Sequence, residues 1–178
     1  NAPSILIVGL GPGSPALLTQ ETRHALDSAP RVILRTRHHP PVSALGRQSA
    51  AWEDCADLYQ QPAGFEALYE AIAGRVLASA ATAPTVYAVP GHPLVAERSV
   101  TAILATAEER GVTVRIMPAL SFADLAAVSL RIDLGAVQLC DALDLRIDAQ
   151  RPALVSQVFD RDATTALKLR LLESYPPD

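Results

Sequence analysis

Residues 85–94 read TVYAVPGHPL, an apolar run followed directly by a loop that contains two prolines, a glycine and a histidine. A short continuous apolar run is typical of a strand buried on both faces of a parallel sheet. A connection between elements needs only a turn, whereas a loop that holds a ligand needs backbone groups fixed in place, as proline and glycine fix them. The stretch therefore predicts a buried strand and, directly after it, a candidate ligand loop.

A second stretch of similar design lies near the start of the chain, where residues 5–15 read ILIVGLGPGSP. Gly9, Gly11 and Gly13 follow an apolar strand, and glycine allows both left-handed backbone angles and a close approach to a ligand. The spacing is G-x-G-x-G rather than the G-x-G-x-x-G of dinucleotide loops, and Pro12 has no N–H for a phosphate. A turn that binds nothing is the simplest alternative. Two stiff loops at strand ends favour a ligand site, because α/β sheets bind ligands there.

Apolar periodicity divides the chain into alternating strands and helices. The expected helices span residues 19–28, 65–81, 96–110, 121–130 and 164–175, and the expected strands span residues 5–8, 31–35, 55–59, 86–89, 112–117, 137–145 and 152–159. Residues 35–42, which include two prolines, are expected to form a loop. Strands that alternate with helices predict an α/β fold with a mostly parallel sheet. Because the pattern changes after residue 117, we expect two α/β domains, residues 1–117 and 118–178, the second thin for a core of its own.

Composition limits the classes of partner. The 178 residues are 49% apolar and 19% charged with a net charge of -4, which suits a folded core. Mild acidity and 4% aromatic residues argue against nucleic acid, and no apolar run reaches membrane-spanning length. Cys55 and Cys140 stand far apart, as ordinary thiols of a cytoplasmic protein do. The adjacent His38 and His39 have no carboxylate partner at metal-ligand spacing, so we expect no metal site.

The two loops together resemble those of the tetrapyrrole methylases, S-adenosylmethionine-dependent enzymes of cobalamin and sirohaem synthesis. Family members look like VGxGPGD after the first strand and GDP after a later one, and here residues 8–14 read VGLGPGS and residues 90–93 read PGHP. The segments LLTQETRHAL and VRIMPALSFAD fit the same pattern. Over nearly the whole chain, one branch of the family is similar in LRTRHHPPV, YAVPGHPLVAE, LCDAL and SQVFDRDATTALKLRLLESYPPD. That branch is the N-terminal methylase-like domain of bacterial proteins fused to a MazG-type nucleotide pyrophosphohydrolase.

The resemblance implies two α/β domains with S-adenosylmethionine folded into the cleft between them, and a second domain that is truncated in this chain. It implies a methyltransferase whose acceptor is an unidentified small molecule, a homodimer as in the family, and a longer protein that includes the MazG-type domain. The residues that match cofactor-contacting positions of the family are Pro12, Pro90, Gly91, His92, Val95, Ser121, Phe122 and Asp141. The resemblance assigns no catalytic residue and requires no metal.

Two departures from the family pattern leave a second function open. Where active members often carry an aspartate after the second strand, residues 34–37 read LRTR, and His92 replaces the aspartate of GDP. These departures favour a non-catalytic module that senses a ligand or acts as a scaffold for the fused hydrolase. The arginines and histidines of residues 35–39 are either solvated loop residues or an anion-binding lip over an acceptor pocket.

Overall fold

The computed structural model describes residues 4–46, 51–60, 64–158 and 161–175 of the chain, which forms two compact units, Asn1–Phe122 and Ala123–Asp178. The domain boundary expected after residue 117 lies shortly before this division, and the assignment of two separate domains stays a prediction. The first unit contains a five-stranded sheet with the strand order β3-β2-β4-β1-β5. All its pairings among the described residues are parallel, which confirms the predicted α/β fold with a parallel sheet. The elements up to the last strand of this sheet are β1 (Ser4–Gly9), η1 (Pro15–Leu17), α1 (Gln20–Ser28), β2 (Arg31–Leu34), α2 (Pro40–Ala44), β3 (Glu53–Asp54), η3 (Ala56–Gln60), α3 (Gly64–Ala80), β4 (Thr85–Val89), α4 (Arg98–Glu109) and β5 (Thr113–Ile116).

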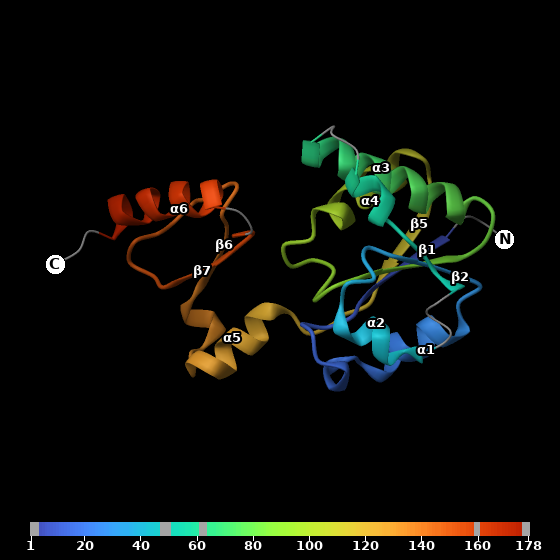
Figure 1. Cartoon of the computed structure of the whole chain (residues 1–178), viewed down its shortest axis with the longest axis horizontal. Coiled ribbons are helices and arrows are strands. Elements are labelled where there is room, and N and C mark those ends of the chain that lie inside the picture. Colours follow the sequence, from blue (N-terminus) through green and yellow to red (C-terminus); the bar gives the residue numbers. More distant parts are fainter. Residues whose placement is uncertain (1–3, 47–50, 61–63, 159–160, 176–178) are drawn as a thin grey trace. The chain divides into compact units, whose positions relative to one another are not determined.

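Successive side chains of the central strands point to opposite faces of this sheet. Ile7 of β1 and Tyr87 of β4 are buried in the cluster formed with α3 and α4. Val8 and Ala88, one residue further along each strand, are buried in the cluster formed with α1 and α2. Figure 1 shows these two pairs of helices on opposite sides of the sheet. Because both faces are covered, every residue of β4 is buried, which is why a continuous apolar run predicts this strand.

The second unit contains a two-stranded parallel sheet in which β6 pairs with β7. The remaining elements of the chain are α5 (Phe122–Leu130), η4 (Leu134–Ala136), β6 (Gln138–Asp141), β7 (Ala153–Ser156) and α6 (Arg161–Ser174). Both strands are shorter than the predicted ranges, and Phe159, at the end of the second range, lies outside the described residues. Large apolar side chains are exposed in this unit, among them Val128 at 77% and Leu169 at 59%.

Local structure confirms one helix start and corrects two other expectations. The N–H of Thr22 donates to the side chain of Thr19 at 3.1 Å, so Thr19 caps α1 at the residue where the predicted helix begins. The loop predicted for residues 35–42 instead contains α2, which begins with two prolines, because proline at the first helical positions removes only N–H groups that would lack a helical partner anyway. The strand predicted for residues 55–59 is wrong, since residues 56–60 form a 3-10 helix.

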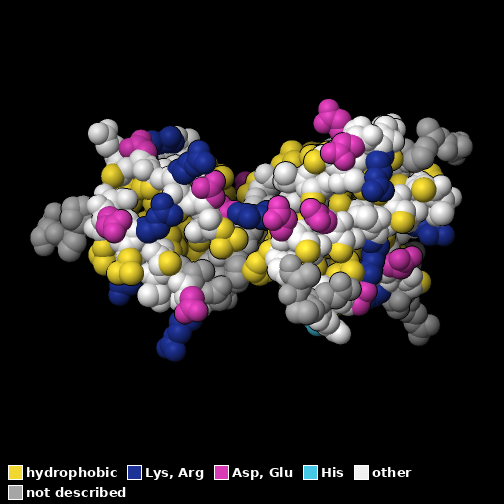
Figure 2. Space-filling view, turned by 90° about the horizontal axis from the view of Figure 1, so that it is seen from above, with side chains coloured by type: hydrophobic (Ala, Val, Ile, Leu, Met, Phe, Trp, Pro, Cys, Tyr) yellow, Lys and Arg dark blue, Asp and Glu magenta, His cyan; other side chains and the backbone are white. Residues whose placement is uncertain are grey.

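Charges of both signs are interspersed on one face of the molecule. On the face shown in Figure 2, Lys and Arg side chains lie among Asp and Glu side chains, and neither sign forms a broad patch in the described part of that face. That face therefore offers a polyanion no single area of positive charge to bind. Among the helices that the structure describes, none has the length and apolar character needed to cross a membrane.

Gly9 ends β1 at a point where another backbone segment passes very close. A Cβ atom on Gly9 would lie 2.3 Å from the carbonyl oxygen of Gly91, 2.5 Å from Cβ of Ala119 and 2.8 Å from Cδ of Pro93. All three distances are far inside van der Waals separation, and none of these atoms is the free end of a flexible side chain. The packing of the chain on itself therefore requires glycine at residue 9, whatever the loop binds.

Gly9→Ala is expected to lower the free energy of unfolding by about 2–3 kcal/mol, because the added methyl group forces packed segments apart. Gly74→Ala is the matched control. Gly74 lies inside α3, where a Cβ meets no atom within 4 Å, and alanine is favoured over glycine in a helix by about 0.5–1 kcal/mol. Urea denaturation measures both changes, and equal stability of Gly9→Ala and the wild-type protein would contradict the close approach.

Cys55 is fully buried, and burial raises the pKa of its thiol to about 11. In the unfolded chain a cysteine has a pKa of about 8.5, so between these two values the folded protein holds a proton that the unfolded chain has lost. Stability is therefore expected to fall as pH rises above about 8.5, by roughly 3 kcal/mol at most. Urea denaturation between about pH 7.5 and 9.5 measures this slope. Cys55→Ala removes the group and should give a shallower slope, whereas parallel slopes would rule out this linkage.

Candidate functional site

The carboxyl ends of β1 and β4 form a topological switch point. These strands are neighbours in the sheet, yet α1, which follows β1, covers one face and α4, which follows β4, covers the other. Where consecutive connections leave a sheet toward opposite faces, α/β proteins bind ligands outside the strand ends. Two segments emerge at this point: residues 9–14, named here the glycine loop, and residues 90–97, named the His92 loop.

Backbone hydrogen bonds join these two loops. The N–H of Leu10 donates to the carbonyl oxygen of Val89 at 2.8 Å. Gly11 and Gly91 exchange hydrogen bonds, from Gly11 N–H at 3.2 Å and from Gly91 N–H at 2.9 Å. Their φ angles are 73° and 67°, values that glycine adopts without the strain that a side chain would add. The two glycines thus fix the loops to each other through backbone atoms alone.

His39 adds a side-chain link that the sequence did not identify. Its Nε2 lies 2.8 Å from the carbonyl oxygen of Gly11, so the ring donates a proton to the glycine loop. This oxygen also accepts from Gly91 N–H, so both of its acceptor positions are filled. The neighbouring His38 is exposed, and its backbone N–H donates to the Thr36 hydroxyl. Within the described ranges, His, Cys, Asp and Glu side chains do not gather in groups of three or more that could hold a metal ion.

A free donor and open space remain on the His92 loop. A Cβ on Gly91 would meet no atom within 4 Å. The backbone N–H of Leu94 donates to Nδ1 of His92 at 3.0 Å, so the neutral ring carries its proton on Nε2. This Nε2–H has no partner among the described residues. The loop therefore presents an uncharged hydrogen-bond donor close to unfilled space.

The end of the His92 loop is held in a strained conformation. Ala96 has a φ of 56°, in the left-handed region, which costs a residue with a side chain about 1–2 kcal/mol. Glu97, the next residue, caps α4: its Oε1 accepts hydrogen bonds from the N–H of Ser99 at 3.2 Å and from the Ser99 hydroxyl at 2.7 Å. Backbone strain of this kind persists only where the surrounding contacts fix the conformation.

The basic residues after β2 do not form the free anion-binding lip considered from the sequence. Nε of Arg35 lies 3.1 Å from Oε1 of Glu97, and Arg37 forms an ion pair with Asp54. Burial by itself would lower the pKa of Arg35, but the Glu97 carboxylate, together with Tyr87 and Tyr69, raises this pKa above its usual value. Each guanidinium thus faces a carboxylate of the same chain, and neither is a free charge that could recruit an anion.

The paired loops bring five of the eight predicted cofactor residues together: Pro12, Pro90, Gly91, His92 and Val95. Of the other three, Ser121 is buried and Phe122 is 38% exposed, just before and at the start of α5. Asp141 ends β6 in the second unit, where its Oδ1 accepts a hydrogen bond from the N–H of Leu143 at 2.8 Å. A role in cofactor binding stays a prediction for all eight residues.

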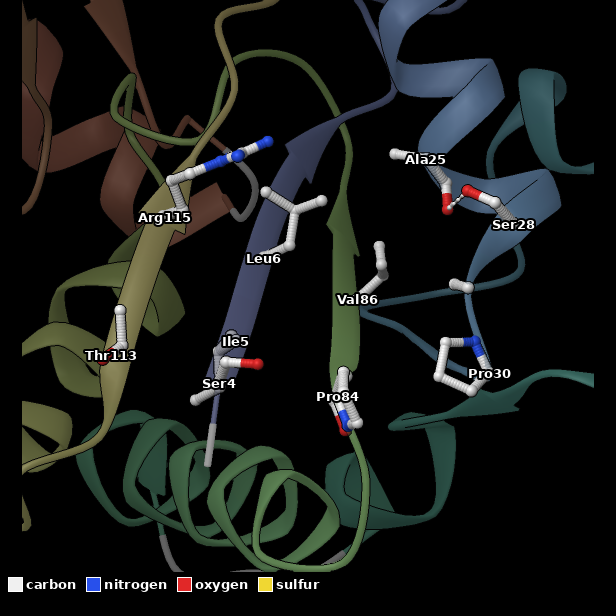
Figure 3. Close-up of a pocket in the computed structure, with 12 residues that line it drawn as sticks. Ser4, Ile5, Leu6, Ala25, Ser28, Pro30, Pro84, Val86, Thr113 and Arg115 are labelled. Carbon is white, nitrogen blue, oxygen red and sulfur yellow. Dashed lines mark hydrogen bonds between the residues drawn. The ribbon is translucent and has the colours of Figure 1, made fainter. Parts of the chain in front are cut away.

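A separate hollow of about 380 Å³ lies at the opposite edge of the sheet, beside the amino ends of β1, β4 and β5. Figure 3 shows Leu6 and Val86 on neighbouring strands, with Ala25 and Ser28 on α1 and Arg115 on β5. Ligands of parallel α/β sheets bind at the carboxyl ends of the strands, where the following loops emerge. This hollow is therefore not the candidate site.

The sequence and the fold match known proteins. The sequence model of the family described as tetrapyrrole (corrin/porphyrin) methylases matches residues 4–171. The chain is 34% identical over 181 residues to the uncharacterized protein YabN of Bacillus subtilis (strain 168); the alignment covers 99% of this chain and 37% of YabN. The chain thus spans well under half of the length of that relative.

Solved structures with the same fold include two of uroporphyrin III C-methyltransferase from Thermus thermophilus. The native form is 25% identical with a TM-score of 0.66, over 93% of this chain and 76% of the other. The complex with S-adenosyl homocysteine is 22% identical with a TM-score of 0.62, over 93% of this chain and 72% of the other. On the strength of the family match along most of its length, this chain belongs to the tetrapyrrole methylase family.

Proposed function

We propose that this chain is the S-adenosylmethionine-binding, methyltransferase-like part of a protein that methylates a small molecule. The proposal rests on the pairing of the glycine loop with the His92 loop at the switch point between β1 and β4. The Thermus thermophilus relative whose structure contains S-adenosyl homocysteine makes this nucleoside thioether the first ligand to test. The acceptor is a small molecule of unassigned structure.

The chemistry of the loops suits a sulfonium nucleoside. Such a ligand combines a cationic sulfur with an amino-acid end that carries a carboxylate and an ammonium group. It therefore needs walls without free positive charge and hydrogen-bond donors near the carboxylate. The His92 loop offers the Nε2–H donor of His92 and open space beside Gly91. The nearby guanidiniums of Arg35 and Arg37 are paired with carboxylates, so they add no free cation that would repel the sulfur.

Bound S-adenosylmethionine would supply a methyl group to an acceptor atom that approaches in line with the carbon–sulfur bond. The task of this chain is then to hold both partners at a fixed distance and angle, which contributes a large share of the rate in such reactions. Loops tied by backbone hydrogen bonds suit this task better than loops positioned by flexible side chains.

We also propose that the chain belongs to a longer protein with a MazG-type nucleotide pyrophosphohydrolase domain. The support is the resemblance of segments such as YAVPGHPLVAE to that branch of the family. The relative YabN is itself much longer than the aligned region, which leaves room in YabN for further domains.

A non-catalytic module that binds the cofactor and signals to the fused hydrolase is the second candidate. The Arg35–Glu97 pair favours it, because a neutralised arginine occupies the place where active members often carry an aspartate. Turnover distinguishes the two candidates. The full-length protein is incubated with labelled S-adenosylmethionine and porphyrinogens, and transfer of label to any of them would exclude the non-catalytic module. Binding of the cofactor without transfer would favour it.

Gly91→Val is expected to weaken binding of S-adenosyl homocysteine by at least about tenfold, roughly 1.4 kcal/mol, because the side chain enters the open space of the loop. Gly111→Val is the matched control. Gly111 has a φ of 64°, close to the 67° of Gly91, and also faces open space, but it lies beyond the far end of α4. Isothermal titration calorimetry gives both affinities, and circular dichroism confirms folding. Equal affinity of folded Gly91→Val and wild type would remove the His92 loop from the site.

A further inference from the structure

We infer that Arg35 is a positioning residue that, by holding Glu97, fixes the His92 loop in the form that presents Gly91 and His92. The inference rests on the function proposed above, because it concerns the same site. Arg35 follows the last residue of β2, while Glu97 ends the loop and caps α4. Their side chains are only 19% and 10% exposed, and Nε of Arg35 lies 3.1 Å from Oε1 of Glu97. The pair thus ties the end of the loop to a strand that is not adjacent to it in sequence.

Arg35 is itself fixed from several sides. Its backbone N–H donates to the carbonyl oxygen of Ala88 in β4 at 2.8 Å. Its guanidinium carbon lies 5.2 Å from the centre of the Tyr59 ring and 6.0 Å from that of Tyr69. Aromatic faces attract a guanidinium, so these rings favour one place for the side chain. A mobile surface arginine could not determine the position of a loop, whereas an arginine held in this way can.

Arg35 supplies the positive charge that stabilises the Glu97 carboxylate, which lies at the end of a buried series of hydrogen-bonded hydroxyl groups. The hydroxyls of Tyr87 and Ser99 lie 2.8 Å apart, and both residues are fully buried. The Ser99 hydroxyl in turn donates to Oε1 of Glu97. These hydroxyls supply hydrogen bonds but no positive charge. Loss of the Arg35 guanidinium would leave a largely buried negative charge without its ion-pair partner, a situation that strongly favours rearrangement.

Because the backbone at Ala96 is strained, the Arg35–Glu97 ion pair beside it matters for the conformation of the His92 loop. Ala96, with its φ of 56°, directly precedes Glu97. A residue with a side chain leaves the left-handed region when nothing holds it there. The start of the loop is held by the backbone pair between Gly11 and Gly91, and its end is held by Arg35. His92 lies between these two anchors, so loss of the second one removes one of the contacts that hold the segment with its ring.

Hydrogen exchange tests the inference without any ligand. In Arg35→Gln, the amides of His92 and of residues 94–97 are expected to exchange at least about tenfold faster than in wild type, relative to the amides of β1. Arg75→Gln is the matched control, because it removes an arginine paired with Asp57 at 2.6 Å but outside the loops, and it should leave exchange of residues 92–97 unchanged. Arg35→Lys keeps the positive charge and should restore part of the protection.

A double variant shows whether Arg35 acts through Glu97. Glu97→Gln should accelerate loop exchange as Arg35→Gln does, and the double variant should exchange no faster than the quicker single variant, because both changes remove one interaction. Additive effects would mean that the two residues act independently and would overturn the inference. If Arg35→Gln does not fold, Arg35→Lys and Glu97→Gln still decide the matter, and wild-type exchange of the loop in both would equally overturn it.

Titration with S-adenosyl homocysteine separates this inference from the proposed function. If the wild-type protein binds, Arg35→Gln should weaken binding by about tenfold and Arg75→Gln should not. If the wild-type protein does not bind, the proposed function fails, while the exchange experiment still decides whether Arg35 positions the loop. Faster loop exchange combined with unchanged affinity would overturn Arg35 as a positioning residue of the binding site.

Discussion

The structure depends on a very close approach between two backbone segments, the glycine loop after β1 and the His92 loop after β4. Gly9 lies so near the carbonyl oxygen of Gly91 that no Cβ atom fits between them, and Gly11 and Gly91 exchange hydrogen bonds. This contact joins loops that are far apart in sequence and follow neighbouring strands of the sheet. Backbone atoms therefore define the candidate site, and their positions are less variable than those of side chains would be.

The segment after β2 supports both of these loops. Arg35 holds the end of the His92 loop through Glu97, and His39, further along the segment, donates to the carbonyl oxygen of Gly11 in the glycine loop. Arg37, between them, pairs with Asp54 at the end of the neighbouring strand β3. Basic residues that in sequence suggest recruitment of an anion thus have internal partners. Their function in the folded chain is to fix the two loops and the strand beside them.

The central strands and the two loops after β1 and β4 were predictable for a physical reason, whereas β3, α2 and the links between the loops were not. Burial on both faces leaves a continuous apolar run such as that of β4, and parallel strands bring their carboxyl ends to one edge. The need for glycine at Gly9 depends on a carbonyl contributed by a distant part of the chain. The sequence likewise gives the identities of His39 and Arg35 but does not indicate which groups they bind in the folded chain. The prolines that open α2 misled because proline both excludes central strands and starts helices.

The ion pair between Arg35 and Glu97 also affects how the two departures from the family pattern, at Arg35 and His92, bear on cofactor binding. An unpaired guanidinium close to a sulfonium would oppose binding, because like charges repel in the low dielectric of a protein site. The Glu97 carboxylate at 3.1 Å cancels most of that field. The His92 ring accepts from Leu94 N–H on Nδ1 and in its neutral form adds no charge. Arginine and histidine at these two positions are therefore compatible with a cationic cofactor, because what such a ligand meets is the net charge of the site and not the identity of each residue.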